Sequence, residues 1–320
     1  MRLIKVLLVV IGILCQPIDL CAQNNVHEQL YQSMLLEQAG EHDRVISVVP
    51  ALLMSEALSP QERGRGWVLL GAAYQAKGDF AQAQSSYDRA IRIFEGDESF
   101  AEDYAATLKN YAGLYRDLWQ SSSAIKVLEK TIPIYKKLGN HSGLASSYAM
   151  LGELELNLDH RRKSSEYLSQ ALEEAKLANE TNDDLMATIS STQAWLALKE
   201  GDARAAISGY EHAVELWQHK HGEEHSLTGW GYVLLGKAYA QIGQDSNALA
   251  KMSKGIDILR RSVGEGNPQF LVAEDAYARL LDRSGEHAKA SVLKKNSQMG
   301  LANLYHGKCV SCQISILALR

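Results

Sequence analysis

Proline, the strongest helix breaker, is scarce in this sequence. Only 5 of its 320 residues are proline, and no long run of Val, Ile and Thr is bounded by turn residues, as a β-strand would require. The abundance of Ala, Leu, Ser, Glu and Gln favours helices instead. The composition therefore predicts an all-α protein, and the length allows either two compact domains or one elongated array.

An excess of positive charge is also lacking. The 33 Lys and Arg residues stand against 38 Asp and Glu residues, which gives a formal net charge of -5. The longest basic cluster is the short segment at residues 161–163. Nucleic-acid binding usually requires a basic patch or stripe, so we do not expect nucleic acid as a partner.

The common sequence signatures of enzymes are absent. The chain has no Gly-x-x-x-x-Gly-Lys-Ser/Thr, no His-Glu-x-x-His and no Gly-x-Ser-x-Gly motif. Its 4 cysteines are too few for a disulfide scaffold. We therefore expect a non-enzymatic protein with no catalytic residues and no cofactor.

The N-terminus has the order of regions typical of a secretory signal. Arg2 and Lys5 precede an apolar stretch at residues 6–14, and the small residue Ala22 follows at the expected distance. The apolar stretch is well short of the ~18 to 20 residues of a membrane-spanning helix, so no stable membrane span is expected. We predict that residues 1–22 are a signal peptide cleaved after Ala22, and that the protein is exported, either periplasmic or secreted.

One segment of the sequence almost repeats itself. GRGWVLLGAAY at residues 64–74 matches GWGYVLLGKAY at residues 229–239. If three further copies lie between them, the period is about 41 residues, which is typical of arrays of helix pairs. Seven copies can be placed, with starts near residues 26, 64, 105, 145, 187, 229 and 271. We predict a solenoid over residues 23–305, followed by a C-terminal tail at 306–320.

Small and aromatic residues recur at fixed spacings within the copies. In the second copy they are Trp67, Leu70, Gly71, Tyr74, Gly78, Ala83, Tyr87 and Ala90. This pattern resembles the tetratricopeptide consensus. The resemblance implies a right-handed α-solenoid of about seven helix-turn-helix repeats, with a concave face lined by the first helices. Gly71 would let two helices approach closely, and Gly78 would end the first helix in a left-handed conformation.

The spacing of about 42 residues is similar to the longer repeat of kinesin light chains, a variant found in many bacterial exported proteins. Two linkers, at residues 216–226 and 260–268, are similar to the Gly-x-x-His-Pro linker of that family. The first lacks the proline, and the second has Asn267 where histidine is usual. Repeats of this kind bind many unrelated partners, so the resemblance is specific for the fold and not for the function.

Four histidines lie close together beside two glutamates. They are His212, His219, His221 and His225, with Glu223 and Glu224. Imidazole and carboxylate groups together suit zinc, but proximity in sequence does not arrange four ligands as a tetrahedron. We interpret the group as a solvated helix end and a linker, and predict no metal site.

Cys309 and Cys312 have the Cys-x-x-Cys spacing. Such a pair can be redox-active when a helix N-terminus lowers the pKa of the first thiol. No βαβ pattern precedes it, and Gln313 stands where a c-type haem motif needs histidine. We favour a structural Cys309–Cys312 disulfide in a tail that folds back over the last helix, with thiol-disulfide chemistry as the alternative.

The concave face of the resembled repeat class is lined by fixed positions of each first helix. Counting those positions gives a partner-binding groove at Lys109, Asn110, Arg116, Glu153, Trp195, Trp230, Lys237 and Arg279. Further groove positions are Asp117, Asn157, Lys199, Asp275, Asp282 and Arg283. Trp195 and Trp230 are candidate anchors, because aromatic residues are enriched among binding hot spots.

Lys109 and Asn110 are similar to the lysine and asparagine that bind a peptide carboxylate in chaperone-binding relatives. That clamp takes residues from three successive repeats, and the neighbouring copies here have Val68, Ala72, Ser146 and Met150 at those positions. The clamp is therefore not reproduced. We expect a scaffold or adaptor that holds a peptide or protein partner in the groove. The alternatives are a structural module of an envelope assembly and a thiol-disulfide enzyme.

Overall fold

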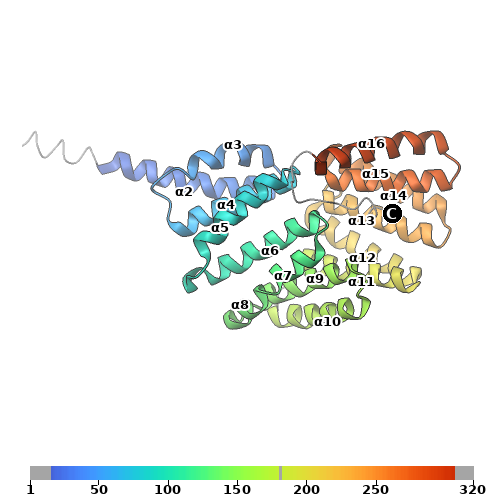
Figure 1. Cartoon of the computed structure of the whole chain (residues 1–320), viewed down its shortest axis with the longest axis horizontal. Coiled ribbons are helices and arrows are strands. Elements are labelled where there is room, and N and C mark those ends of the chain that lie inside the picture. The colour runs from blue at the N-terminus through green and yellow to red at the C-terminus, as the bar shows by residue number, and fades with distance from the viewer. Residues whose placement is uncertain (1–15, 180–181, 307–320) are drawn as a thin grey trace, which may run out of the picture. The chain divides into compact units, whose positions relative to one another are not determined.

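Helices make up all the regular structure that the chain shows in the described ranges. The computed structural model describes residues 16–179 and 182–306, and no strand occurs within them (Figure 1). The prediction of an all-α solenoid is confirmed. Cys309, Cys312 and the tail that contains them lie outside the described residues, as does the apolar stretch at 6–14. None of the described helices combines the length and the hydropathy needed to span a bilayer.

The chain divides into two compact units, Met1–Asn110 and Tyr111–Arg320, and the division falls inside one helix. The helices of the first unit are α2 (Gln16–Gln38), α3 (His42–Leu52), α4 (Pro60–Ala76), α5 (Phe80–Phe94) and η1 (Glu98–Phe100), followed by the start of α6 (Ala101–Asp117). Helix α3 packs on α2 and α4, and α5 packs on α4. Their seam is an apolar cluster in which Val45, Val49 and Ala73 are fully buried.

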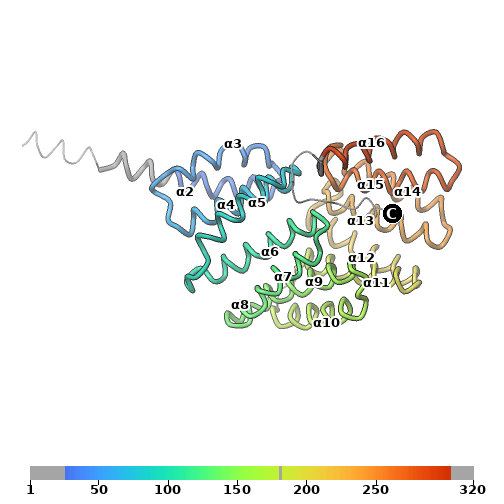
Figure 2. Tube along the Cα trace, in the orientation of Figure 1, coloured from blue at the N-terminus to red at the C-terminus, as the bar shows by residue number. Residues whose placement is uncertain are grey.

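The second unit continues as a stack of helix pairs. Its helices are α7 (Ser121–Leu128), α8 (Thr131–Leu138), α9 (His141–Asn157), α10 (Arg161–Ala178), α11 (Asp183–Glu200), α12 (Ala203–His221), α13 (Ser226–Gln241), α14 (Asp245–Ser262), α15 (Pro268–Arg283) and α16 (His287–His306). From α9 onward each odd-numbered helix packs against the even-numbered helix that follows it, and each pair packs against the next (Figure 2). We call α9, α11, α13 and α15 the first helices of these pairs.

The first helices end in the left-handed conformation that the sequence predicted from its glycines. Gly201 and Gly243 follow α11 and α13 with φ of 89° and 74°. Two repeats lack a glycine at this point and place Trp119 (φ 59°) and Asp159 (φ 60°) there instead. A left-handed residue with a Cβ atom costs about 1–2 kcal/mol. Two repeats accept this cost, so the geometry of the repeat, and not only the residue type, sets where the first helix ends.

Glycines inside the helices allow the close approach that the repeat requires. A Cβ atom on Gly71 would lie 2.6 Å from the Tyr87 ring, and one on Gly236 would lie 2.5 Å from Cγ of Met252. Both distances are far below van der Waals contact. These two glycines hold the same place in the two matching segments, so the same packing occurs in both units.

The second helix of the third repeat is broken into α7 and α8. Pro133 lies in the first turn of α8, and it cannot donate a backbone hydrogen bond to the carbonyl of Glu129, where α7 has ended. Oγ1 of Thr131 instead donates to the carbonyl of Leu128 at 2.7 Å and contacts Oγ of Ser147 in α9 at 2.9 Å. The break is thus held by side-chain hydrogen bonds.

Candidate functional site

Four predicted groove residues occupy one equivalent position on the four first helices of the second unit. Glu153, Trp195, Lys237 and Arg279 are evenly spaced in the sequence, each one repeat length after the one before. They lie on α9, α11, α13 and α15. We call this row the first-helix ladder. One helical turn later, a second row at the same spacing consists of Asn157, Lys199, Gln241 and Arg283.

The second row connects neighbouring repeats. Nε2 of Gln241 donates to the carbonyl oxygen of Leu198 at 3.1 Å, and Nη2 of Arg283 donates to the carbonyl oxygen of Ala240 at 3.0 Å. Each side chain thereby adds a bond from the next repeat to an end carbonyl of the preceding first helix, which also accepts from the backbone N–H of Gly201 or Gly243. Arg283 also pairs with Asp245. Gln241 and Arg283 of the second row therefore have a structural role.

Trp195 is only half-exposed. Its ring packs against an apolar cluster that includes Tyr210 of α12 and Leu235 of α13. The ammonium of Lys199 lies 5.8 Å from the centre of the same ring, within the range of a cation–π contact. Trp195 therefore contributes to the seam between repeats as well as to the surface.

Lys237 has no comparable structural contact. Its side chain is exposed, yet desolvation by the surrounding protein lowers its pKa, and the positive charges of Arg279 and Lys199 lower it further. Among the residues at 16–179 and 182–306, no carboxylate forms an ion pair with Lys237, whereas Lys199 pairs with Asp159 at 3.2 Å.

Arg279 is held on its own helix by a buried acid. It pairs with Oδ2 of Asp275, whose side chain is only 7% exposed. Oδ1 of Asp275 is buried without a hydrogen-bond partner among the described residues. Arg279 is thereby fixed on α15, and its positive charge lowers the pKa of Lys237 on α13.

Arg116, Lys109 and Asn110, which were also predicted to line the groove, are paired with acids or partly buried. Nη1 of Arg116 lies 3.4 Å from Oε2 of Glu153, and Nη2 lies 3.1 Å from Oδ1 of Asp117. The charges of Glu153 and Asp117 raise the pKa of Arg116, so this cation is neutralised within the protein. Lys109 and Asn110 are half-buried in the part of α6 that belongs to the first unit, where burial lowers the pKa of Lys109.

Trp230 is half-buried near the start of α13. It lies two helical turns before Lys237, so both side chains belong to one face of the helix. The structure thus places Trp195, Lys237 and Arg279 at equivalent positions of α11, α13 and α15, and places Trp230 farther along the same face of α13 as Lys237. The pairing of Arg116 with Glu153, and the absence of an acidic partner for Lys237 among the described residues, could not be derived from the repeat pattern.

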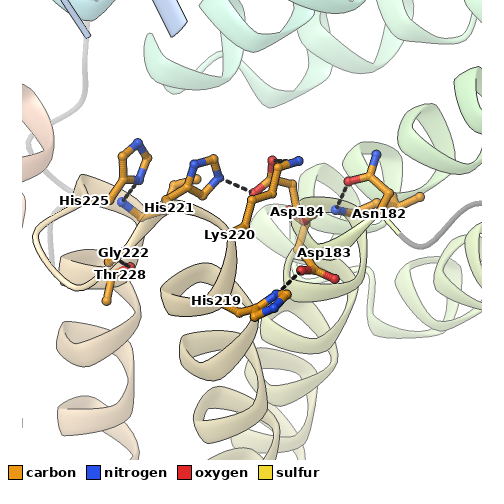
Figure 3. A network of polar contacts seen from close by, with 12 residues as sticks. Asn182, Asp183, Asp184, His219, Lys220, His221, Gly222, His225 and Thr228 are labelled. Atoms are coloured by element: carbon orange, nitrogen blue, oxygen red, sulfur yellow. Dashed lines mark hydrogen bonds and ion pairs between the residues drawn. The ribbon is translucent and has the colours of Figure 1, made fainter. Parts of the chain in front are cut away.

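The histidine group forms ordered contacts within the α11–α12 pair and with the start of α13, and is not simply a solvated helix end. Nδ1 of His219 lies 2.8 Å from Oδ2 of Asp183, and Nε2 of His221 lies 2.6 Å from Oδ1 of Asp184 (Figure 3). Lys220 pairs with the other oxygen of Asp184 at 2.7 Å. The end of α12 is thus tied to the start of α11. No cluster of three or more His, Cys, Asp and Glu in the described ranges is arranged to hold a metal ion.

His225 connects this network to the next helix. Its ring stacks on the ring of His221 with the centres 4.2 Å apart, and its Nδ1 accepts a hydrogen bond from the backbone N–H of Leu227 as the cap of α13 (Figure 3). Desolvation and then the charge of His221 lower the pKa of His225. Burial works to raise the pKa of Asp184, but the hydrogen bonds from Lys220 and His221 outweigh it and the pKa is lowered.

Comparison with known proteins agrees with the fold of stacked helix pairs. The family model of the tetratricopeptide repeat matches residues 62–137 and 185–261. The chain is a tetratricopeptide-repeat protein. Its repeats are of the kinesin-light-chain type: it is 24% identical over 221 residues to Protein KINESIN LIGHT CHAIN-RELATED 3 of Arabidopsis thaliana, a match that covers 68% of this chain and 33% of that protein. The chain therefore spans about a third of the length of this relative.

Solved structures share the tetratricopeptide-repeat fold over most of this chain. The apo form of RapI superposes with a TM-score of 0.64 at 15% identity, covering 88% of this chain and 100% of RapI. A Rap protein complexed with Competence and Sporulation Factor superposes with a TM-score of 0.59 at 15% identity, covering 89% of this chain and 99% of that protein. At these identities the similarity establishes the fold alone.

Proposed function

We propose that this tetratricopeptide-repeat protein is a non-enzymatic scaffold that holds a peptide or protein partner against the first helices α11, α13 and α15. The observation that carries the proposal is Lys237. It is exposed, desolvated and next to two other cations, and no described carboxylate pairs with it. Such an arrangement adds nothing to folding and is suited to an external ligand.

The neighbouring residues support this surface over other parts of the second unit. Trp195 presents part of its ring beside Lys199, and Trp230 lies on the same face of α13 as Lys237. Aromatic and cationic side chains are those that dominate binding energy at interfaces. A Rap protein of the same fold holds Competence and Sporulation Factor, which is a precedent for a ligand on this architecture.

The proposed scaffold acts outside the cytoplasm. The support is the secretory pattern of residues 1–22, in which a basic start, an apolar stretch and a small residue follow in order. Export would place Cys309 and Cys312 in an oxidising compartment, where a disulfide is stable. In this proposal the cysteine pair stiffens the tail and carries no thiol-disulfide exchange.

A pair of charge reversals tests the proposal. Wild-type protein, Lys237→Glu and Arg204→Glu would each be used to capture partners from the native organism, with mass spectrometry as the readout. Arg204 is an exposed cation in the first turn of α12 and is the matched control. We expect Lys237→Glu to weaken capture of a specific partner at least about tenfold, a change of about 1.4 kcal/mol, and Arg204→Glu to leave it unchanged. Equal capture by all three proteins would refute the proposed surface.

A further inference from the structure

The first and the last helix pair each have one face that no neighbouring pair covers within the described ranges. At the interior boundary between α12 and α13, Tyr210 and Leu235 belong to one apolar cluster. A Cβ atom on Gly231 of α13 would lie 2.7 Å from Cγ2 of Val214 of α12. The second helix of one pair thus packs against the first helix of the next. No pair precedes α2, and none follows α16, among the described helices.

The face of α16 that would receive a following first helix is basic. Counted from the left-handed glycine that precedes each second helix, the positions of Tyr210 and Val214 are taken by Lys294 and Gln298. α16 contains three lysines and no Asp or Glu. A shallow depression of about 410 Å³ on this face is lined by Ser291, Lys294, Lys295, Gln298, Met299 and Ala302. A following helix would therefore meet positive charge where the interior boundary is apolar.

The face of α2 that a preceding second helix would cover carries the opposite charge. α2 has the place of a first helix in its pair with α3. Counted back from the left-handed glycine that follows each first helix, the positions of Gly231 and Leu235 are taken by Glu28 and Gln32. Both are exposed, and Nε2 of Gln32 donates to Oε1 of Glu28 at 2.6 Å. α2 contains no Lys or Arg.

A polar end face can also serve only to keep a repeat protein soluble. Such a face would not retain large exposed apolar side chains, yet Tyr31 and Leu35 of α2 are 55% and 40% exposed, and Met299 of α16 is 55% exposed. Like charges on the two end faces would also prevent stacking, because like charges across an interface are unfavourable. The two faces have opposite charges instead, which favours contact between them.

We infer that the protein associates with itself head to tail, with the α16 face of one copy packed on the α2 face of a second copy and Lys294 opposite Glu28. The exposed Met299 and Tyr31 would be buried in the same contact. Each added copy leaves one free face of each kind, so the assembly can grow beyond a dimer. The inference goes beyond the proposed scaffold function and uses neither Lys237 nor Trp195.

The C-terminal tail is the other segment that could cover α16. Its Lys308 and Arg320 repeat the positive charge of the α16 face, and residues 307–320 contain no Asp or Glu to pair with Lys294. The charges therefore favour a second copy over the tail.

Single and mixed charge reversals test the inference. Sedimentation velocity over a concentration series, at low and at high salt, would compare the purified wild type with Lys294→Glu, Glu28→Lys and an equimolar mixture of these two variants. Each variant alone has like charges on its two end faces. The mixture brings the reversed α16 face of one variant against the reversed α2 face of the other. Lys126→Glu, which reverses an exposed lysine of α7, is the matched control.

We expect the wild type and Lys126→Glu to associate, and salt to weaken the association by screening the charges. Lys294→Glu and Glu28→Lys should each raise the concentration of half-association at least about tenfold, with unchanged circular dichroism spectra, and their mixture should return to the wild-type value.

Three results would overturn the inference: a wild type that stays monomeric up to about 0.5 mM, association that neither reversal weakens, or a mixture that associates no better than the single variants. If the wild type is monomeric and association begins when residues 307–320 are removed, the tail occupies the α16 face. None of these results bears on the surface proposed around Lys237.

Discussion

Gln241 on α13 donates a hydrogen bond across the repeat boundary to the carbonyl oxygen of Leu198 at the end of α11, at 3.1 Å. Arg283 makes the same bond to Ala240, one repeat later. The register between consecutive first helices is therefore fixed at their C-terminal ends. This register is what brings Trp195, Lys237 and Arg279 onto equivalent positions.

Loss of this bond should cost a small, measurable amount of stability. Gln241→Ala removes one partly solvated hydrogen bond, for which we expect a loss of about 0.5–1.5 kcal/mol in the free energy of unfolding. Chemical denaturation would measure it. Asn247→Ala, in the exposed first turn of α14, is the control and should cost less. A Gln241→Ala protein as stable as the wild type would show that the bond does not contribute.

Two glycines should respond to alanine for different reasons. Gly201 has φ of 89° and open space around a Cβ atom, so Gly201→Ala should cost only the backbone penalty of about 1–2 kcal/mol. Gly236→Ala would place a Cβ atom 2.5 Å from Met252 and should cost about 1–3 kcal/mol through overpacking. Combining each variant with Met252→Ala should relieve part of the clash in the second case only, since the carbonyl oxygen of Ala248, 2.9 Å from the same Cβ position, remains. An unchanged melting temperature for either single variant would contradict its explanation.

The repeat pattern predicted the fold because its signals are local. Gly71, Tyr87 and the glycine stops act within one helix pair, so they can be recognised from spacing alone. The left-handed helix ends at Trp119 and Asp159 and the division inside α6 have no such local signal. The repeat pattern predicted both Arg116 and Lys237 as binding positions and did not distinguish between them. Only the geometry between helices shows that Glu153 neutralises the first, whereas no described acid pairs with the second.

The histidine network also depends on contacts that sequence proximity conceals. The partners of His219 and His221 are Asp183 and Asp184, at separations of 36 and 37 residues. The acids begin α11 and the histidines end α12, and these two helices form one packed pair, so a search of the first turn of α11 could have found them. His225 has the same place in its repeat as Asn267 has in the next, and both cap the following helix.

His225 should make stability depend on pH. Its pKa is lowered from the ordinary value of 6.5, so the unfolded chain binds a proton more readily than the folded one. Its contribution is complete above about pH 6.5 and is lost as the pH falls below that value. Over this range His225→Asn should show a weaker decrease in melting temperature than the wild type, because asparagine retains the cap without titrating. Identical pH profiles would exclude this role of His225.

Leu235 should behave as a core residue, in contrast to Lys237 on the same helix. Its side chain is 1% exposed in the cluster around Tyr210, so Leu235→Ala should lower the free energy of unfolding by about 2–5 kcal/mol. Lys237→Met should leave it unchanged or slightly higher. Trp195→Ala should fall between the two, since part of the ring packs in the seam. A Lys237→Met variant as unstable as Leu235→Ala would assign Lys237 to the fold.

The central claim is that the partner lies against the face of α13 that carries Trp230 and Lys237, and photo-crosslinking tests it most directly. Benzoylphenylalanine would replace Trp230 in one protein and Leu177, a 62% exposed residue of α10, in another. Irradiation in the presence of the captured partner should produce a covalent adduct from position 230 and none from position 177. An adduct from position 177 alone would place the partner on the second helices and contradict the account.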